Sequence, residues 1–243
     1  MPISLNTFNQ QPKGWIVVKQ NKNLKGIKSQ TVHRRPKKRR KYVRSFFGES
    51  ASKAVGPLAP GCEIYGFTKG QFSLIDLIEH CLVCTGPADV FIATWSAAAG
   101  DIQRAHKFLK NGRIRSIRFL VDYSFQSRKP EFCSELVATF GHDVLRVTVT
   151  HAKYVLIRND DWNLVIRTSM NLNYNPRFEN FEISDDLEFA DFQQAIIDEV
   201  WSGQDVAEGF EGRPQDNKEK FRKSFQEQGS IFGDSFPDGR DLL

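Results

Sequence analysis

The middle of the chain alternates short apolar runs with amphipathic runs, and few folds accommodate that alternation. Residues 88–97 (ADVFIATWSA) and 116–125 (SIRFLVDYSF) are rich in β-branched and aromatic residues, as in strands buried on both faces. Residues 72–84, 101–112 and 130–141 instead have apolar positions at helical spacing. Strands alternating with helices in this way predict the α/β class, with a mixed β-sheet sandwiched between helices.

The later part of this region is richer in strands. Residues 143–157 read as strand with a break near Thr150, and residues 162–169 return through a polar turn. A short strand is expected at 180–184, and residues 187–201 have the period of a closing amphipathic helix. The whole pattern fits one hydrophobic core of ordinary domain size.

Charge divides the chain into three parts. Residues 1–55 carry 14 Lys or Arg and one acidic residue, residues 56–202 carry 14 and 19, and residues 203–243 carry 6 and 9. A segment so charged and so poor in apolar anchors cannot bury a core. We therefore expect a basic, largely disordered arm (1–55), a folded domain (56–202) and an acidic, Gly-rich, disordered tail (203–243).

The arm is suited to contact with a polyanion, because each Lys or Arg beside a phosphate releases a counterion. The same composition is typical of a nuclear-import signal or a solubilising tail. The residues expected to contact nucleic-acid phosphates are Arg34, Arg35, Lys37, Lys38, Arg39, Arg40, Lys41 and Arg44.

Several classes of protein are disfavoured. No apolar run is long enough for a transmembrane helix, and the first residues lack the apolar core of a signal peptide. Four cysteines are too few for a disulfide framework, so we expect a cytoplasmic location, or a nuclear one if the arm directs import. Cys81 and Cys84 beside His80 have zinc-like spacing, but no second pair follows, so core packing is favoured and no metal is expected.

Two polar pairs interrupt the later strands. His151 and Lys153 stand two apart, as do Ser169 and Asn171. Residues two apart on a strand share a face, so each pair should project one way. A buried lysine is costly unless an anion accompanies it. Together the pairs predict a phosphate site at one edge of the sheet, with Trp95 expected beside it.

In order and spacing these residues resemble the phospholipase D superfamily. The resemblance covers about residues 88–201 and implies a half-domain of that fold. Its motif elements here are H-x-K (His151, Lys153), S-x-N (Ser169, Asn171) and N-x-E (Asn180, Glu182). Two positions depart from the family pattern, since Arg158 replaces an aspartate and Thr168 replaces a glycine.

The resemblance implies a phosphodiesterase that needs no metal or other cofactor. His151 would attack phosphorus and form a phosphohistidine that water then hydrolyses. Lys153 and Asn171 would hold the non-bridging oxygens, and Ser169 would add a hydrogen bond. Glu182 would orient an imidazole and stabilise its charged form.

This mechanism uses two histidines, one as nucleophile and one as proton donor to the leaving group. The chain has a single motif, because no other histidine is followed by a lysine two residues on. A two-fold dimer would bring two motifs together. The resemblance therefore implies a homodimer with one composite centre at its interface.

The basic arm favours nucleic acid as substrate, and DNA in particular, held by its backbone without sequence readout. The first hypothesis is a metal-independent endonuclease. A non-catalytic nucleic-acid-binding dimer is the second, with Arg158 and Thr168 as signs of a degenerate site. A phospholipid-cleaving or transferring enzyme is the third. A protein partner for either terminal segment is compatible with all of them.

Overall fold

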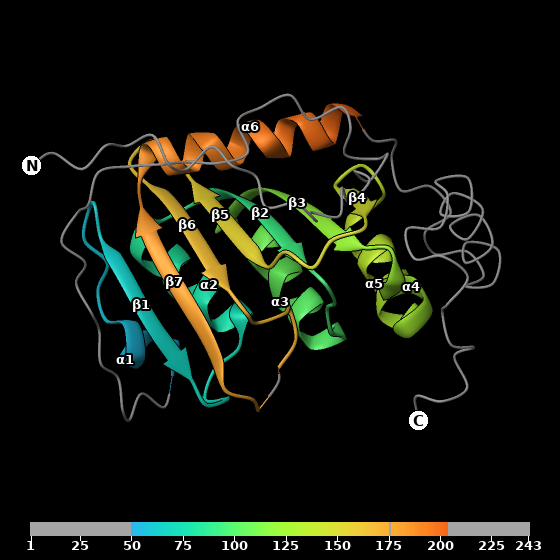
Figure 1. The fold of residues 1–243 in the computed structure, drawn as a ribbon, viewed down its shortest axis with the longest axis horizontal. Helices are drawn as coiled ribbons and strands as arrows, with labels where there is room; N and C mark the ends of the chain where they lie inside the picture. Colours follow the sequence, from blue (N-terminus) through green and yellow to red (C-terminus); the bar gives the residue numbers. More distant parts are fainter. Residues whose placement is uncertain (1–49, 175, 204–243) are drawn as a thin grey trace, which may run out of the picture.

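The computed structural model describes residues 50–174 and 176–203, so most of the predicted arm and tail lies outside the described residues. Seven strands form one sheet in the order β1-β7-β6-β5-β2-β3-β4 (Figure 1). The strands are β1 (Glu63–Thr68), β2 (Ala88–Thr94), β3 (Ile114–Asp122), β4 (Leu145–Thr148), β5 (Tyr154–Arg158), β6 (Asn163–Thr168) and β7 (Glu179–Asp185). The helices are α1 (Ala51–Val55), α2 (Leu74–Thr85), α3 (Ala99–Lys110), α4 (Ser124–Arg128), α5 (Pro130–Phe140) and α6 (Leu187–Gly203).

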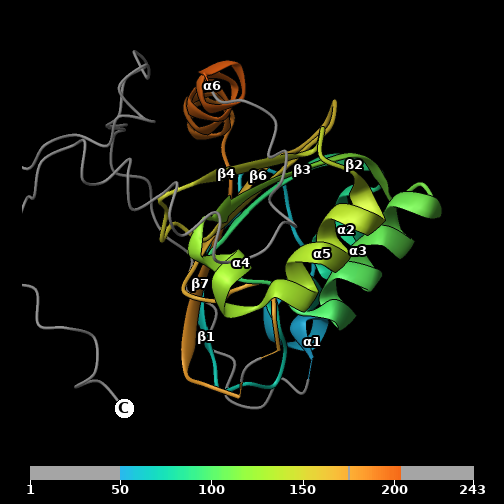
Figure 2. The same cartoon turned by 90° about the vertical axis from the view of Figure 1, so that its right-hand side faces the viewer.

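Helices cover both faces of this sheet. Helices α2, α3 and α5 lie along one face, while α6 lies on the other (Figure 2). The sheet is mixed, because β2, β3 and β4 are parallel and the remaining neighbours are antiparallel. The predicted α/β class, a mixed sheet between helices, is confirmed. No helix within the described ranges is long and apolar enough to cross a bilayer.

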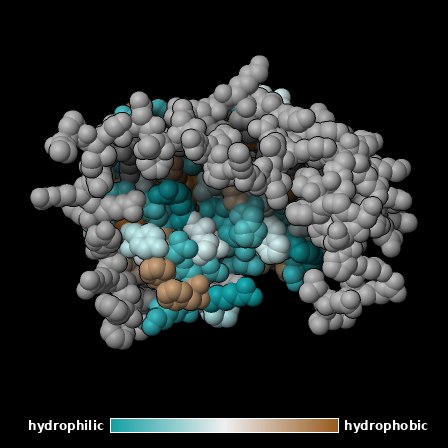
Figure 3. Space-filling model, in the orientation of Figure 1, coloured by the Kyte–Doolittle hydropathy of each residue, from teal (hydrophilic) through white to brown (hydrophobic). Residues whose placement is uncertain are grey.

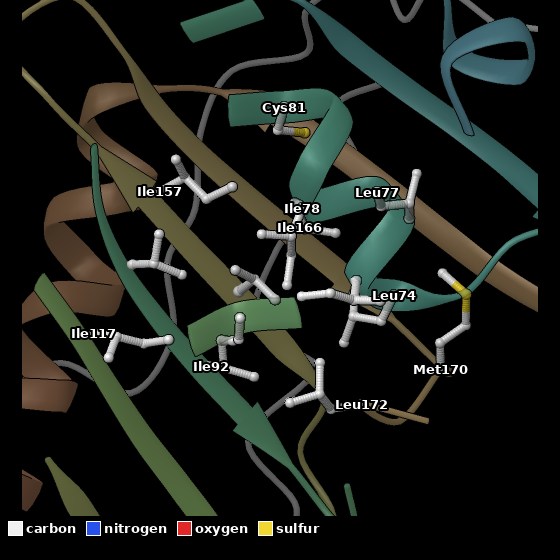
Figure 4. Packing of buried hydrophobic residues seen from close by; sticks show 14 of the residues in the cluster. Leu74, Leu77, Ile78, Cys81, Ile92, Ile117, Ile157, Ile166, Met170 and Leu172 are labelled. Carbon is white, nitrogen blue, oxygen red and sulfur yellow. The ribbon is translucent and has the colours of Figure 1, made fainter. Parts of the chain in front are cut away.

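The two faces of β2 explain why its centre, residues 90–93, is apolar throughout. Ile92 is buried among Leu74 and Ile78 of α2 and the neighbouring strands (Figure 4). Phe91 and Ala93 alternate with it and are buried in a second cluster beneath α6. A strand buried on both faces has no solvent side, so the run carries no alternating polar positions.

Helix boundaries follow local signals in part. Helix α2 begins after Ser73, and the Asp76 carboxylate accepts the Ser73 N–H at 2.7 Å. Helix α5 begins at Pro130 and ends before Gly141, whose φ is 82°. Helix α3 begins before the predicted segment 101–112, at Ala99, so Asp101 lies inside its first turn and is buried.

Other segments differ from the sequence prediction. Strand β1 was not predicted, since it is an edge strand with a half-exposed pattern and a central glycine. The expected strand over 116–125 ends at Asp122, because the next residues turn into α4. Helix α1 buries Ala51, Ala54 and Val55 in the main core, so the folded domain begins before the predicted boundary at 55/56.

The strand directions bring many chain ends to one edge of the sheet, called here the site edge. It contains the carboxyl ends of β1, β2, β3, β4 and β6 and the amino ends of β5 and β7. Strand β5 pairs with β2, whereas β4 is two strands further out. The chain that leaves β4 must therefore cross the ends of β3 and β2 before it can enter β5.

Candidate active site at the edge of the sheet

His151 and Lys153 lie in this crossing segment. They precede β5, which begins at Tyr154, so the prediction that they stand on a strand is wrong. The Asp122 carboxylate at the end of β3 holds the crossing by accepting the Thr150 N–H at 3.0 Å. The Lys153 Nζ lies 3.4 Å from both ring nitrogens of His151. The two side chains therefore meet, although strand alternation is not the cause.

Trp95 lies directly after β2 and flanks His151. The two ring centroids are 5.5 Å apart in a T-shaped arrangement. On Trp95 itself, the Arg128 guanidinium carbon lies 3.4 Å from the ring centroid, and Arg128 Nη2 donates to the Trp95 carbonyl at 2.9 Å. The indole is thus fixed by a cation–π contact and supports the imidazole.

Ser169 follows the last residue of β6 and lies against the start of β7. Its hydroxyl donates to the Glu179 carboxylate and accepts the Asn180 N–H at 3.0 Å. Its own N–H donates to the Asn180 carbonyl at 3.1 Å. Ser169 is therefore held by backbone and side chain at the site edge.

Glu179 was not singled out from the sequence, although a signal for it was present. Phe181 and Ile183 are buried in the main core, and alternation places Glu179 on their side of β7. Because Glu179 opens the strand, its carboxylate reaches the site edge instead of the core. There it meets Ser169.

Lys153 lies between two carboxylates. Partial burial lowers the pKa of its ammonium from the usual value, while Glu179 and, to a lesser extent, Asp122 oppose that shift. Asp122 is itself buried and has Arg128 at 4.0 Å. The two cations of the cluster, Lys153 and Arg128, are thus matched by two carboxylates.

Glu182 is directed away from this cluster. Alternation places it on the face of β7 toward α6, where it forms an ion pair of 2.5 Å with Arg167 of β6. The Arg167 guanidinium carbon in turn lies 5.0 Å from the ring centroid of Phe189 in α6. Asn180 shares the strand face of Glu182, and its backbone, as described above, anchors Ser169.

Asn171 lies where the chain leaves β6 and passes the end of β2. The neighbouring Leu172 donates its N–H to the Ser96 carbonyl at 3.2 Å. The Asn171 Oδ1 is buried, and no described residue offers it a hydrogen bond. That oxygen can only accept a hydrogen bond, so the Asn171 Nδ2 is the group able to donate to a phosphate oxygen.

The two departures from the family pattern have structural partners. Arg158 ends β5 at the edge opposite the site, where it donates to Asn163 at 3.0 Å and to Asp191 of α6 at 2.8 Å. The Thr168 hydroxyl donates to the Asn180 carbonyl at 2.7 Å and accepts the Met170 N–H at 3.0 Å. Arg158 thus stabilises packing far from His151, and Thr168 braces the end of β6.

The zinc-like spacing in α2 has another explanation. Cys81 is fully buried in the main core, and the His80 Nε2 lies 2.7 Å from the Gly56 carbonyl. Cys84 Sγ is 3.8 Å from the same nitrogen. Within residues 50–174 and 176–203, no group of three or more His, Cys, Asp or Glu is arranged to hold a metal ion.

Comparison with known proteins gave matches among solved structures alone. No family model and no curated protein matches the chain. NucT from Helicobacter pylori is 14% identical, with a TM-score of 0.42, over 59% of this chain and 99% of that one. Nuc from Salmonella typhimurium, a phospholipase D family member, is 13% identical, with a TM-score of 0.40, over 59% and 96%. Similarity of this degree identifies neither substrate nor activity.

Proposed function

We propose that the protein is a metal-independent phosphodiesterase, an endonuclease that cleaves DNA through a phosphohistidine at a homodimer interface. The observation that carries this proposal is the meeting of His151, Lys153 and Ser169 with Glu179 at one edge of the sheet. These groups come from separate strand ends. An imidazole beside an ammonium, a hydroxyl and a carboxylate provides a nucleophile and groups that stabilise charge, as phosphoryl transfer requires.

In the first displacement, the unprotonated ring nitrogen of His151 attacks phosphorus. A P–N bond forms while the P–O bond to the departing nucleoside breaks, and the departing oxygen takes a proton from a second imidazolium. Lys153 and Asn171 stabilise the charge on the non-bridging oxygens. In the second displacement, water attacks phosphorus, gives its proton to the second imidazole and releases His151.

Glu179 is the carboxylate that acts with this group. It accepts the Ser169 hydroxyl, which fixes where that hydroxyl lies, and its charge keeps Lys153 more basic than burial alone would. Glu182 has neither contact and is paired with Arg167 instead. We therefore propose that Glu179 orients Ser169 and supports the charge of Lys153, and that Glu182 has no orienting role at this site.

The second histidine is expected from a second copy of the chain. His151 is exposed at the site edge, as a residue that reacts across a two-fold axis must be. The other described histidines are remote from the site edge. His80 contacts the residue after α1, His106 packs its ring on Phe140 of α5, and His142 precedes β4 at the opposite edge.

DNA is favoured as substrate by the basic N-terminal segment, since the site itself has no excess positive charge. Its two cations are balanced by Glu179 and Asp122, so long-range attraction of a polyanion must come from elsewhere. The first 55 residues carry 14 Lys or Arg against one acidic residue. Such a segment binds phosphate backbones with strong dependence on salt.

The test is cleavage of single- and double-stranded DNA in excess EDTA by the wild type and by His151→Ala. His142→Ala is the matched control, since it removes a histidine at the far edge of the sheet. We expect EDTA-resistant cleavage that falls by at least about 10³-fold in His151→Ala alone. DNA binding without cleavage by the wild type would overturn the enzyme in favour of a binding dimer.

A further inference from the structure

Two phenylalanine rings are stacked in solvent beside the candidate active site. Phe67 of β1 and Phe178, directly before β7, have ring centroids 4.9 Å apart and an interplanar angle of 11°. Their exposures are 48% and 67%, which is high for side chains of this size. Tyr65 meets Phe67 edge-on at 5.3 Å. Figure 3 shows a hydrophobic patch over the adjoining ends of β1 and β7, with polar surface beside it.

The exposure follows from strand alternation at the edge of the sheet. Ile64, Gly66 and Thr68 of β1 are buried on the side of α2, so Phe67 must project to the other side. Helix α6 lies on that side, but it packs over β5 and β6 and leaves β1 open (Figure 2). Within the described ranges, no element covers the pair.

The stacked pair adjoins one residue of the candidate active site along the chain. Phe178 immediately precedes Glu179, which accepts the Ser169 hydroxyl. Arg177, which directly precedes Phe178, is exposed. Lys69, two residues after Phe67, is exposed as well. Flat aromatic faces bordered by cations, next to a phosphate site, have the composition of surfaces that bind single-stranded nucleic acid.

The platform is also held in place before any ligand arrives. Gly70 follows β1 with φ of 86°, and a Cβ on it would lie 2.5 Å from Pro176 Cα. The segment leading into Phe178 therefore packs directly on the backbone of the turn after β1. In that turn the Thr68 hydroxyl donates to Gln71 at 2.9 Å. A rigid platform loses little conformational entropy when a base stacks on it.

We propose that Phe178 and Phe67 form a stacking platform for an unpaired base next to the scissile phosphate, so that the substrate is single-stranded or locally unpaired DNA. The inference rests on the proposed function for the identity of the neighbouring phosphate site. The outer face of Phe178 continues the two-ring stack and offers a plane to one base. A base inside a duplex already has neighbours on both faces and cannot use this plane.

The experiment measures binding by the full chain carrying His151→Ala, in EDTA, so that no cleavage intervenes. The probes are a short single-stranded DNA containing 2-aminopurine and the same sequence as a duplex. Phe178→Ala is compared with Phe178→Trp and with Val83→Ala, which removes an equally exposed apolar side chain from α2. Sedimentation of each variant reports its oligomeric state.

We expect Phe178→Ala to weaken single-strand binding about 10-fold and to abolish the stacking quench of 2-aminopurine. Duplex affinity and the salt dependence should stay unchanged, because no charge is removed. Phe178→Trp should restore both signals, and Val83→Ala should alter neither.

Two outcomes would overturn the platform. Equal losses for single strand and duplex would show that Phe178 acts through general structure. Dissociation of a dimer with unchanged single-strand affinity would show that a second copy of the chain covers the pair. Absence of wild-type cleavage would remove the proposed function and leave the quench readout intact, so the two failures are distinguishable.

Discussion

Strand β7 carries one glutamate on each face, and the two have different partners. Glu179 and Glu182 are three residues apart, and an odd separation on a strand places them on opposite faces. Glu179 meets a hydroxyl and an ammonium at the site edge, whereas Glu182 is buried and meets Arg167 beside α6. The role of a carboxylate in a motif therefore depends on the strand face that it occupies as well as on its spacing.

The largest expected effect separates these two carboxylates by activity. We expect Glu179→Gln to lower the single-turnover rate of DNA cleavage by about 10²-fold or more, because it removes the acceptor that orients Ser169 and the charge that supports Lys153. Glu182→Gln should stay within about threefold of the wild type. The measurement is single-turnover cleavage in EDTA at saturating protein. A larger loss for Glu182→Gln, with both variants folded, would restore the role read from the motif.

For stability we expect the opposite order, with Glu182→Gln more destabilising than Glu179→Gln. Glu182→Gln removes the buried carboxylate that pairs with the exposed Arg167 guanidinium, and we expect the free energy of unfolding to fall by about 1 kcal/mol. Glu179 lies at the half-exposed start of the strand, so Glu179→Gln should cost less. Denaturant unfolding of both variants makes the comparison, with Asp191→Asn, which breaks an exposed ion pair to Arg158, as the control. Equal losses would mean that burial does not distinguish the two sites.

The pH dependence of cleavage sharpens the comparison further. Burial lowers the pKa of Lys153, so its positive charge is lost at a lower pH than that of a free lysine, and cleavage should fall on the alkaline side accordingly. Glu179 opposes that shift, so Glu179→Gln should move the alkaline limb to still lower pH. Glu182→Gln should leave it in place, and Lys153→Arg should move it upward. Profiles of kcat/KM between about pH 7 and 11 decide the point. An alkaline limb that Lys153→Arg does not move would assign it to another group.

Strand and helix periodicity was enough to predict most of this architecture. The α/β class and the positions of α2, β2, α5 and α6 followed from the apolar spacings along the chain. These are local signals, and local signals decide where elements lie along the chain. Strand order is not local, and β1 was missed because an edge strand is buried on one face alone.

The candidate site shows the same limit. His151, Lys153 and Ser169 could be found from sequence spacing, and the structure brings them to one edge. Their geometry comes from the crossing of the ends of β3 and β2, which depends on strand order and was not predictable. Glu179 was missed because the face of β7 was not assigned. The burial of Phe181 would have assigned it.

The smallest expected effect concerns Asp101, a buried carboxylate that lacks the partners described above for Glu179 and Glu182. Asp101 in α3 has a buried Oδ2 that no described residue hydrogen-bonds, and burial raises its pKa to about 6, although Arg104 opposes this. The folded state then binds its proton more tightly than the unfolded state, whose pKa is near 3.9. Stability contributed here is present at low pH and is lost as pH rises from about 4 to about 6.

We expect Asp101→Asn to raise the free energy of unfolding at pH 7 by about 1 kcal/mol and to flatten its slope across that range, with no effect on cleavage. Unfolding at pH 5 and pH 7, with the exposed Asp143→Asn as control, tests this. A stability loss in Asp101→Asn at pH 7 would show that the charge on Asp101, placed in the first turn of α3, stabilises the helix more than its burial costs.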